Sequence, residues 1–290
     1  MSKHALPLPL IDENSVFSSE EYKSAKEKFK GYMNAGKPSE WQKEQAWAMA
    51  CAHDNYLDLI MRVYAFAEDA IKRKDLENYL GFAETALAHT VYHHQHEEDF
   101  AYPLWTSWLG YNPLPSVSSE HASFASSLQT TLVYIQTVRQ SLHPAIPSPI
   151  SPLNPAHSHL PNPIAPKEVG LDPSKPFDPV ALRKYMDVWV PAMISHLSHE
   201  VDELTPIIME AIGRERLKEF DKLLQNKLRA IDPSWFLVPF VGTWPRNVEK
   251  DVMGLPLIVR KVLIPFVWSR KYWGWWKYLA RPENLTFLGE

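Results

Sequence analysis

One short pattern of histidine, glutamate and proline occurs twice in this chain, over residues 93–103 and 196–206. In both copies a glutamate follows the first histidine by four residues, and a proline follows it by ten. Residues four apart lie on one face of an α-helix, so each copy directs an imidazole and a carboxylate to one place. Two such helices facing each other can surround metal ions with nitrogen and oxygen ligands. The duplication therefore predicts a helical fold built around a metal site.

Apolar residues at helical spacing predict four long helices. We expect these over residues 39–73, 76–102, 118–142 and 178–211, with shorter helices over 19–32 and 214–230. Long helices that carry a short His/Glu pattern are typical of four-helix bundles with a metal site in the core. The expected fold is all-α, with an N-terminal extension (1–38), a four-helix bundle (39–231) and a C-terminal extension (232–290).

Two segments have unusual composition. The prolines of residues 144–179 are dense enough to exclude a regular helix or strand, so we expect a long cover or linker there. The C-terminal extension contains six of the 11 tryptophans, namely Trp235, Trp244, Trp268, Trp273, Trp275 and Trp276. We favour packing of this aromatic extension on the bundle. The alternative places residues 255–276 at a membrane surface, with apolar side chains in the lipid and basic ones at the headgroups.

The overall composition narrows the class of protein. The formal net charge of −4 gives no bias toward nucleic acid. The chain has a single cysteine, Cys51, which excludes a disulfide framework and favours a reducing, cytoplasmic setting. We find neither a signal-peptide pattern at the N-terminus nor an apolar run long enough to span a bilayer.

The order of these motifs resembles the hemerythrin-like, or HHE cation-binding, family over about residues 39–212. Residues 93–103 are similar to that family's second-helix motif, and residues 196–206 are similar to its fourth-helix motif. The family also has a histidine in the middle of its first helix, matched by His53, and one near the start of its third helix, matched by His121. The resemblance implies a four-helix hemerythrin-like bundle that binds two iron ions, with manganese as an alternative metal.

The resemblance also implies a division of labour among six ligands. These are His53, His93, Glu97, His121, His196 and Glu200. The histidines of the first two helices would bind one iron and those of the last two would bind the other. The two glutamates would bridge both ions, because a carboxylate can hold two cations close together.

The chain departs from the oxygen-carrying members of the family at one place. Those members have a second histidine four residues after the one on the third helix, and here that position is Ala125. Four imidazoles and two bridging carboxylates leave about two positions open on two octahedral irons. His94, Glu98, His199 or Glu203 could fill the gap. The residues that we expect as additional ligands or partners of the ligands are His89, His94, Glu98, Glu203 and Tyr56.

An incomplete histidine set, a proline-rich cover and an aromatic extension favour an enzyme over a carrier. We expect a non-heme di-iron oxidoreductase that activates O2 and oxidises a small organic substrate, with no catalytic residues beyond the metal ligands. Elaborated fungal members of the family suggest a role in secondary metabolism. The chain has no nucleotide or flavin motif, so electrons would come from the substrate or an external donor. The alternatives are O2 or iron binding, sensing or storage without catalysis, and a metal-stabilised scaffold for membrane or protein interaction.

Overall fold

The computed structural model describes residues 5–143 and 159–286, so residues 144–158 of the proline-rich insert lie outside the described residues. Every regular element in these two ranges is helical, which confirms the all-α class. The α-helices are α1 (Glu20–Ala35), α2 (Glu44–Lys72), α3 (Leu76–His96), α4 (Tyr102–Leu109), α5 (Pro115–Leu142), α6 (Pro179–Glu203), α7 (Pro206–Ile212), α8 (Arg214–Arg229), α9 (Pro233–Val241), α10 (Arg246–Met253) and α11 (Ser269–Lys271). Two further segments are π-helical, Glu97–Ala101 and Val259–Trp268.

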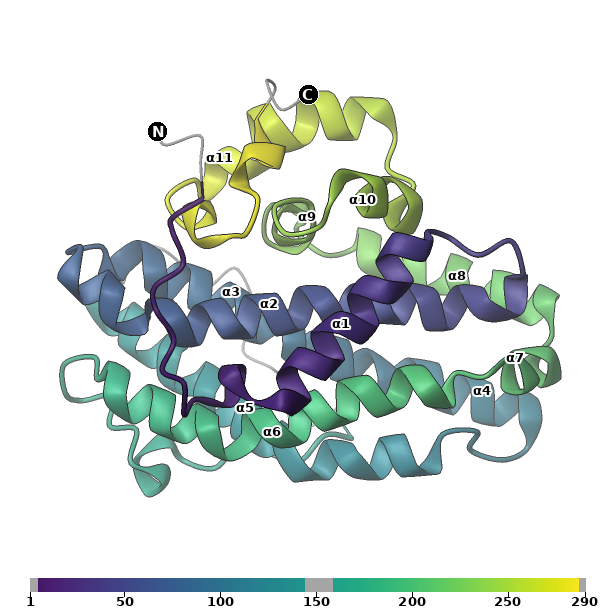
Figure 1. Ribbon diagram of the computed structural model, residues 1–290, viewed down its shortest axis with the longest axis horizontal. Helices are drawn as coiled ribbons and strands as arrows, with labels where there is room; N and C mark the ends of the chain where they lie inside the picture. The colour runs from purple at the N-terminus through teal and green to yellow at the C-terminus, as the bar shows by residue number, and fades with distance from the viewer. Residues whose placement is uncertain (1–4, 144–158, 287–290) are drawn as a thin grey trace.

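The four longest helices, α2, α3, α5 and α6, pack side by side around a common interior (Figure 1). Helix α2 contacts α3 and α6, and α5 contacts α3 and α6, so the four form a closed ring. Helix α1 lies across α2 and α6, where Phe29 is completely buried. Any polar side chain that points into the ring must therefore find its partner among the other inward-facing residues.

Polar caps fix the starts of two helices. Ser19 Oγ accepts a hydrogen bond from the amide of Tyr22 at the start of α1. The carboxylate of Asp178 accepts from two amides in the first turn of α6, and Pro179 stands at the first helical position, where its missing N–H leaves no bond unmade. Helix α5 begins at Pro115, three residues before the predicted start at residue 118, because a proline is also tolerated at its first helical position.

The two copies of the duplicated pattern end differently. After the first copy the helix does not stop, because a π-helical segment (Glu97–Ala101) leads directly into α4, where Pro103 is accommodated in the first turn. A proline ring clashes with the carbonyl four residues earlier in a regular helix, and a wider π turn relieves that contact. The predicted helix over 178–211 is wrong at its end. It stops at Glu203, since Pro206 disfavours helical backbone at the preceding Thr205, which instead caps α7.

The C-terminal segments lie over α2 and α3 (Figure 1). Four of their tryptophans are buried, namely Trp235, Trp244, Trp275 and Trp276. The contact is close, because a Cβ atom added to Gly81 of α3 would lie 2.0 Å from Trp275 Cε2. The indole N–H of Trp244 also donates to the carbonyl of Cys51 on α2 at 2.8 Å. This extension therefore packs on the same two helices that carry two of the predicted metal ligands, His53 and His93.

Within the membrane-surface candidate 255–276, part of the segment is exposed and part is buried. Leu257, Ile258 and Val267 are exposed, whereas Trp275 and Trp276 are buried. None of the helices in the described ranges has the length and apolar character needed to cross a bilayer.

The described part of the proline-rich insert, residues 159–178, follows α5. Side chains of α5 hold its backbone, since Ser126 Oγ donates to the carbonyl of Asn162 at 2.7 Å and Gln129 Nε2 donates to that of Pro161 at 2.6 Å. The backbone carbonyls of an irregular segment are thus satisfied by the helix beside it.

Candidate metal centre

Histidines and glutamates from all four long helices meet inside the ring. They are His53 on α2, His93 and His94 on α3, Glu97 in the π-helical segment, His121 on α5, and His196 and Glu200 on α6. All are at most 3% exposed except His93, whose side chain is 11% exposed. Charges there are poorly screened by water, so each polar atom needs a partner within the cluster.

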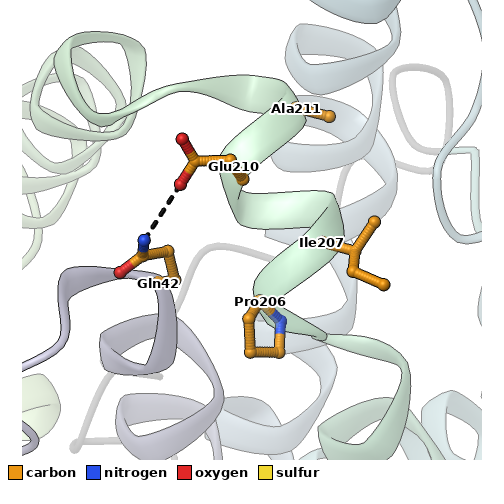
Figure 2. Close-up of a pocket in the computed structure, with 5 residues that line it drawn as sticks. All are labelled: Gln42, Pro206, Ile207, Glu210 and Ala211. Atoms are coloured by element: carbon orange, nitrogen blue, oxygen red, sulfur yellow. Dashed lines mark hydrogen bonds between the residues drawn. The ribbon is translucent and has the colours of Figure 1, made fainter.

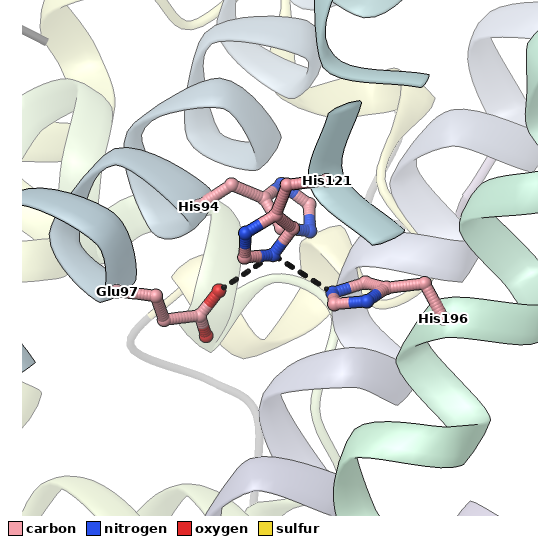
Figure 3. A group of neighbouring side chains, drawn as sticks. All are labelled: His94, Glu97, His121 and His196. Carbon is pink, nitrogen blue, oxygen red and sulfur yellow. Dashed lines mark hydrogen bonds and ion pairs between the residues drawn. The ribbon is translucent and has the colours of Figure 1, made fainter. Parts of the chain in front are cut away.

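The ligand atoms form two overlapping groups. One contains His53, His93, Glu97 and Glu200, and the other contains His94, Glu97, His121 and His196; within each, the ligand atoms lie within 4.8 Å of one another. Figure 3 shows the second group, in which Glu97 and the imidazoles of His94, His121 and His196 point toward one another. Because Glu97 belongs to both groups, the two candidate metal positions are adjacent.

In the first group the Nε2 atoms face the centre. Nε2 of His53 lies 3.0 Å from Nε2 of His93 and 3.3 Å from Oε2 of Glu200. Nε2 of His93 also lies 3.0 Å from Oε1 of Glu97. Four potential ligand atoms from four helical elements are therefore clustered closely enough to share one cation.

In the second group the same inward orientation is repeated. Nε2 of His121 lies 3.0 Å from Nε2 of His196 and 3.5 Å from Oε2 of Glu97. Neither oxygen of Glu97 has a hydrogen-bond partner among the described residues. Oε1 of Glu97 thus faces the first group and Oε2 faces the second, as a bridging carboxylate requires.

Backbone carbonyls fix the tautomers of two histidines. Nδ1 of His53 donates to the carbonyl of Leu197 at 2.7 Å, and Nδ1 of His94 donates to the carbonyl of Thr90 at 2.8 Å. A carbonyl oxygen only accepts, so Nδ1 carries the hydrogen and Nε2 of the neutral ring keeps a lone pair. That lone pair is the one that a metal ion would use.

Carboxylates outside the cluster hold two further histidines in the same way. Oε1 of Glu98 lies 2.6 Å from Nδ1 of His121, and Ser118 Oγ donates to the same oxygen at 2.7 Å. Oε2 of Glu120 lies 3.1 Å from Nδ1 of His196. Histidines that bind metal usually donate their other nitrogen to a carboxylate or carbonyl, and this arrangement fixes the ring orientation.

Two pairs of imidazoles face each other in the cluster, His53 with His93 and His121 with His196, and their geometry indicates whether a metal ion fits. With Nδ1 held outward on both His121 and His196, their two Nε2 atoms face each other across 3.0 Å. Either a proton or a metal ion must lie between or beside these two nitrogens. The donor set and its orientation therefore fit metal ions, and the cluster could bind one in each group.

The pKa values show which forms the buried histidines take. Burial, followed by repulsion from neighbouring imidazoles, holds the pKa values of His93, His94 and His196 well below the ordinary value. These three rings are therefore neutral at physiological pH. Neutral imidazole is the form that binds metal.

The two carboxylates of the cluster shift in opposite directions. Burial, and next the charge of Glu200, raise the pKa of Glu97 to about 8. Burial also acts to raise the pKa of Glu200, but the neighbouring His53 and the hydrogen bond from Tyr102 outweigh burial and hold that pKa below the ordinary value. Two buried carboxylates this close share their negative charge unevenly when no cation is present.

The pKa of His121 is raised, unlike the pKa values of His93, His94 and His196. Burial opposes its protonation, but the carboxylates of Glu97 and Glu98 outweigh burial and raise the pKa of His121 to about 9. Positive charge is therefore favourable at this end of the cluster, which agrees with a site that attracts cations.

A hydrogen bond from Tyr102 adds a further difference between Glu97 and Glu200. Its hydroxyl donates to Oε1 of Glu200 at 2.6 Å, which leaves only Oε2 facing the imidazoles. The resemblance implied that both glutamates bridge, whereas the structure directs two oxygens of Glu97 and one oxygen of Glu200 into the cluster. The two glutamates are therefore unequal ligands.

The additional residues predicted from the sequence have different positions. Tyr56 is buried, with its ring stacked on His93 at 4.5 Å between centroids, and Glu98 holds His121 as described above. His89 is buried but belongs to neither group, since its Nε2 is bound to the carbonyl of Trp235 at 2.7 Å. Glu203 lies near the surface, 3.3 Å from His199 Nε2, and also belongs to neither group.

Tyr102, which contacts Glu200, and Glu120, which contacts His196, were not predicted from the sequence. Tyr102 follows Glu97 by five residues, a spacing that in a regular helix would not place the two side chains on one face. The π-helical segment between them alters that geometry. Glu120 is adjacent to His121 in the sequence, and nothing local indicates that it reaches His196 on another helix.

The structure also has a surface pocket away from the cluster. It is lined by Gln42 and by residues of α7, and Gln42 Nε2 donates to Oε2 of Glu210 at 2.9 Å (Figure 2). None of its lining residues belongs to either group of ligand atoms.

Comparisons with known proteins give no family for this chain: no family model, no curated protein and no solved structure matches it.

Proposed function

We propose that this chain is a hemerythrin-like protein whose four long helices hold a dinuclear metal centre. The observation that carries the proposal is the pair of ligand groups that share Glu97. A single shared carboxylate with both oxygens free supports two adjacent ions rather than two isolated sites. The outward Nδ1 contacts of four histidines support it further, because they leave each Nε2 available.

Iron is the metal that we propose, with manganese as the alternative. Imidazole nitrogen and carboxylate oxygen in one site suit Fe(II) and Fe(III), whereas a calcium or magnesium site would be built from oxygen. Glu97 and Glu200 would supply the negative charge that a buried pair of cations needs.

The reaction that we propose is the oxidation of a small organic substrate with O2. A bound pair of ferrous ions would supply electrons to O2. The residues of the chain would hold the ions and exclude water, as enclosed sites that handle reactive species do. The aromatic extension supports this role, since Phe240 packs on Tyr56 with 5.9 Å between centroids and Tyr56 stacks on His93.

Reversible O2 binding or iron sensing and storage is the second candidate, and one observation favours it. His94 lies in the second group, so the two groups together contain five imidazoles. The lack of an imidazole at Ala125 favoured an enzyme, and His94 is positioned to supply that imidazole instead.

The test is anaerobic loading of the metal-free chain with Fe(II), followed by repeated pulses of O2 in the presence of a reductant such as ascorbate. An oxidoreductase consumes O2 and reductant in every cycle. A chain that binds O2 and releases it unchanged under vacuum, with no loss of reductant, would contradict the catalytic proposal and support the carrier.

A further inference from the structure

A row of large apolar side chains is exposed in the C-terminal extension. It belongs to the π-helical segment (Val259–Trp268) and to the two helical residues before it. The members of this apolar row, each between 40% and 67% exposed, are Leu257, Ile258, Val262, Phe266 and Val267. Ile258, Val262 and Phe266 are spaced four residues apart and therefore lie along one face of the segment. Ile264 of the same segment is completely buried in the main core, so the protein holds one side of the segment and leaves the other side apolar and exposed.

The apolar row lies at the periphery of the molecule. Its segment packs on α9 and α11, and α9 in turn packs on α3. In Figure 1 the segment is the yellow-green helix at the outer edge of the C-terminal segments, with α9 between it and the ring of long helices. The row and the metal cluster are thus separate features, and a role for the row does not depend on the proposed dinuclear centre.

Contiguity distinguishes the apolar row from other exposed apolar residues. Single exposed apolar side chains are common on protein surfaces and need no explanation. Val180 and Val188 of α6 are examples, since they are two turns apart and the exposed Lys184 stands between them. A contiguous apolar patch instead marks a site of interaction with a protein or a membrane.

The charged residues of this part of the chain are basic. Residues 255–276 contain four basic residues and no aspartate or glutamate, although the formal net charge of the whole chain is −4. The four are Arg260, Lys261, Arg270 and Lys271. Helix α10, which precedes them, has equal numbers of basic and acidic residues and does not cancel this excess. Lys271 pairs with Asp232 at 2.5 Å, whereas the exposed Arg270 has its guanidinium carbon 5.6 Å from the ring centroid of Phe266 in the row.

We propose that the apolar row binds the surface of an anionic phospholipid bilayer. Leu257, Ile258 and Val267 would enter the boundary between the headgroups and the acyl chains, as the apolar faces of interfacial helices do. Basic side chains have long apolar stems, so Arg270 would extend from the row to the negatively charged headgroups. The half-buried Trp268 follows the row directly, and indole rings are favoured at this depth of a membrane.

A second copy of this chain is the competing occupant of the row, and charge disfavours it. A symmetric dimer places the same surface of both copies in contact. Contact through the row would therefore bring Arg270 and its basic neighbours of one copy close to those of the other, and like charges facing each other weaken association. An anionic lipid surface instead complements both the apolar and the basic character of this face.

The experiment is co-sedimentation of the full-length chain with vesicles of phosphatidylcholine alone and with vesicles of phosphatidylcholine and phosphatidylserine. The wild type should bind the anionic vesicles at least about tenfold more tightly than the neutral ones, because basic residues near the surface add to the apolar attraction. Added salt should weaken this binding, since it screens the charges. A wild type that stays in the supernatant with anionic vesicles would overturn the proposal.

A pair of variants tests whether the row is the site of contact. Ile258→Ser combined with Val267→Ser should weaken binding to anionic vesicles by about tenfold or more, because both side chains would leave the apolar part of the interface. Val180→Ser combined with Val188→Ser on α6 is the matched control and should bind as the wild type does. All four residues are more than half exposed, so we expect both variants to fold. Equal binding by the two variants would overturn the proposal.

The contribution of charge and the competing occupant are tested separately. Arg270→Gln should weaken binding to anionic vesicles by about fivefold, and Lys184→Gln on α6 should leave it unchanged. Sedimentation velocity without vesicles measures self-association of the wild type. A dimer that the combined Ile258→Ser and Val267→Ser variant dissociates would show that a second copy covers the row, and it would overturn the proposal.

Hydrogen exchange gives a measurement that does not depend on a variant. Anionic vesicles should slow amide exchange of the wild type over residues 256–271 and leave α6 unchanged, because only the bound face is withdrawn from water. Slower exchange elsewhere, with no change over 256–271 in the vesicle-bound chain, would overturn the proposal.

Discussion

The two copies of the His/Glu/Pro pattern have the same spacing but different roles in the fold. In the first copy the helix continues through a π-helical segment, and Glu97 directs both oxygens into the cluster. In the second copy the helix ends at Glu203, and Glu200 uses one oxygen to accept from Tyr102. Identical spacing therefore does not determine identical ligation.

The difference arises from what surrounds each glutamate. Glu97 is in a widened helical turn and has no polar neighbour except the cluster itself. Glu200 is in a regular helix and faces a tyrosine from the first copy. The first copy thus supplies both a bridging carboxylate and the hydroxyl that restrains the carboxylate of the second.

The strongest test of this comparison is to remove each carboxylate charge in turn. Glu97→Gln should weaken the binding of both ions, by about 100-fold, because Glu97 is in both groups. Glu200→Gln should mainly weaken one position, by about tenfold. Calorimetric titration with Co(II) measures both affinities. Equal losses in the two variants would show that the two glutamates are equivalent ligands.

Proton binding should also distinguish the two copies in the metal-free chain. The folded state raises the pKa of Glu97 from 4.5 to about 8, so the folded chain holds a proton there that the unfolded chain has released. The resulting stability is fully present below pH 4.5 and is lost as the pH rises through about 8. For Glu200 the pKa is lowered, so its contribution is instead lost as the pH falls.

The measurement is urea unfolding of the metal-free wild type and of Glu97→Gln across this pH range. The wild type should lose stability relative to Glu97→Gln as the pH rises, by at most about 1.4 kcal/mol per pH unit. A difference that does not change with pH would contradict the raised pKa of Glu97.

The helix of the first copy, α3, is also one of the two helices that the aromatic extension covers. Gly81→Ala places a methyl group against the indole of Trp275, and we expect a loss of about 1–3 kcal/mol in the free energy of unfolding. Gly31→Ala on α1 is the control. No atom lies within 4 Å of its added Cβ, so the higher helix propensity of alanine should stabilise that variant by about 0.5–1 kcal/mol. Stabilisation by both substitutions would show that the extension does not pack on α3.

The smallest expected effect concerns the contact between the two copies. Tyr102→Phe removes the hydroxyl that holds Oε1 of Glu200 and should weaken metal binding by less than the roughly tenfold loss expected for Glu200→Gln. Tyr111→Phe is the control, because Tyr111 is 55% exposed. If both variants bind metal as the wild type does, the restraint on Glu200 is not needed for ligation.

Much of the cluster could be predicted from the sequence, because helical spacing alone places a histidine and a glutamate four residues apart on one face. His53, His93, Glu97, His121, His196 and Glu200 do meet in the interior. The inequality of the glutamates could not be predicted. It depends on a π-helical segment, which apolar periodicity does not reveal, and on Tyr102, whose contact with Glu200 joins distant parts of the chain.

The C-terminal part of the fourth predicted helix illustrates the same limit. Apolar periodicity extended it to residue 211, but Pro206 and the cap formed by Thr205 end α6 earlier and start α7. Periodicity reports which face is apolar and not where the backbone breaks, so local turn chemistry decides the boundary.

The central claim is that side chains from four helices hold two neighbouring metal ions. X-ray absorption spectroscopy of the anaerobically Fe(II)-loaded full-length chain, combined with metal analysis, tests it most directly. We predict two iron ions per chain, nitrogen and oxygen neighbours, and an iron–iron separation of about 3.5–4 Å. One ion or none per chain, or an iron shell with no second iron near that distance, would contradict the account.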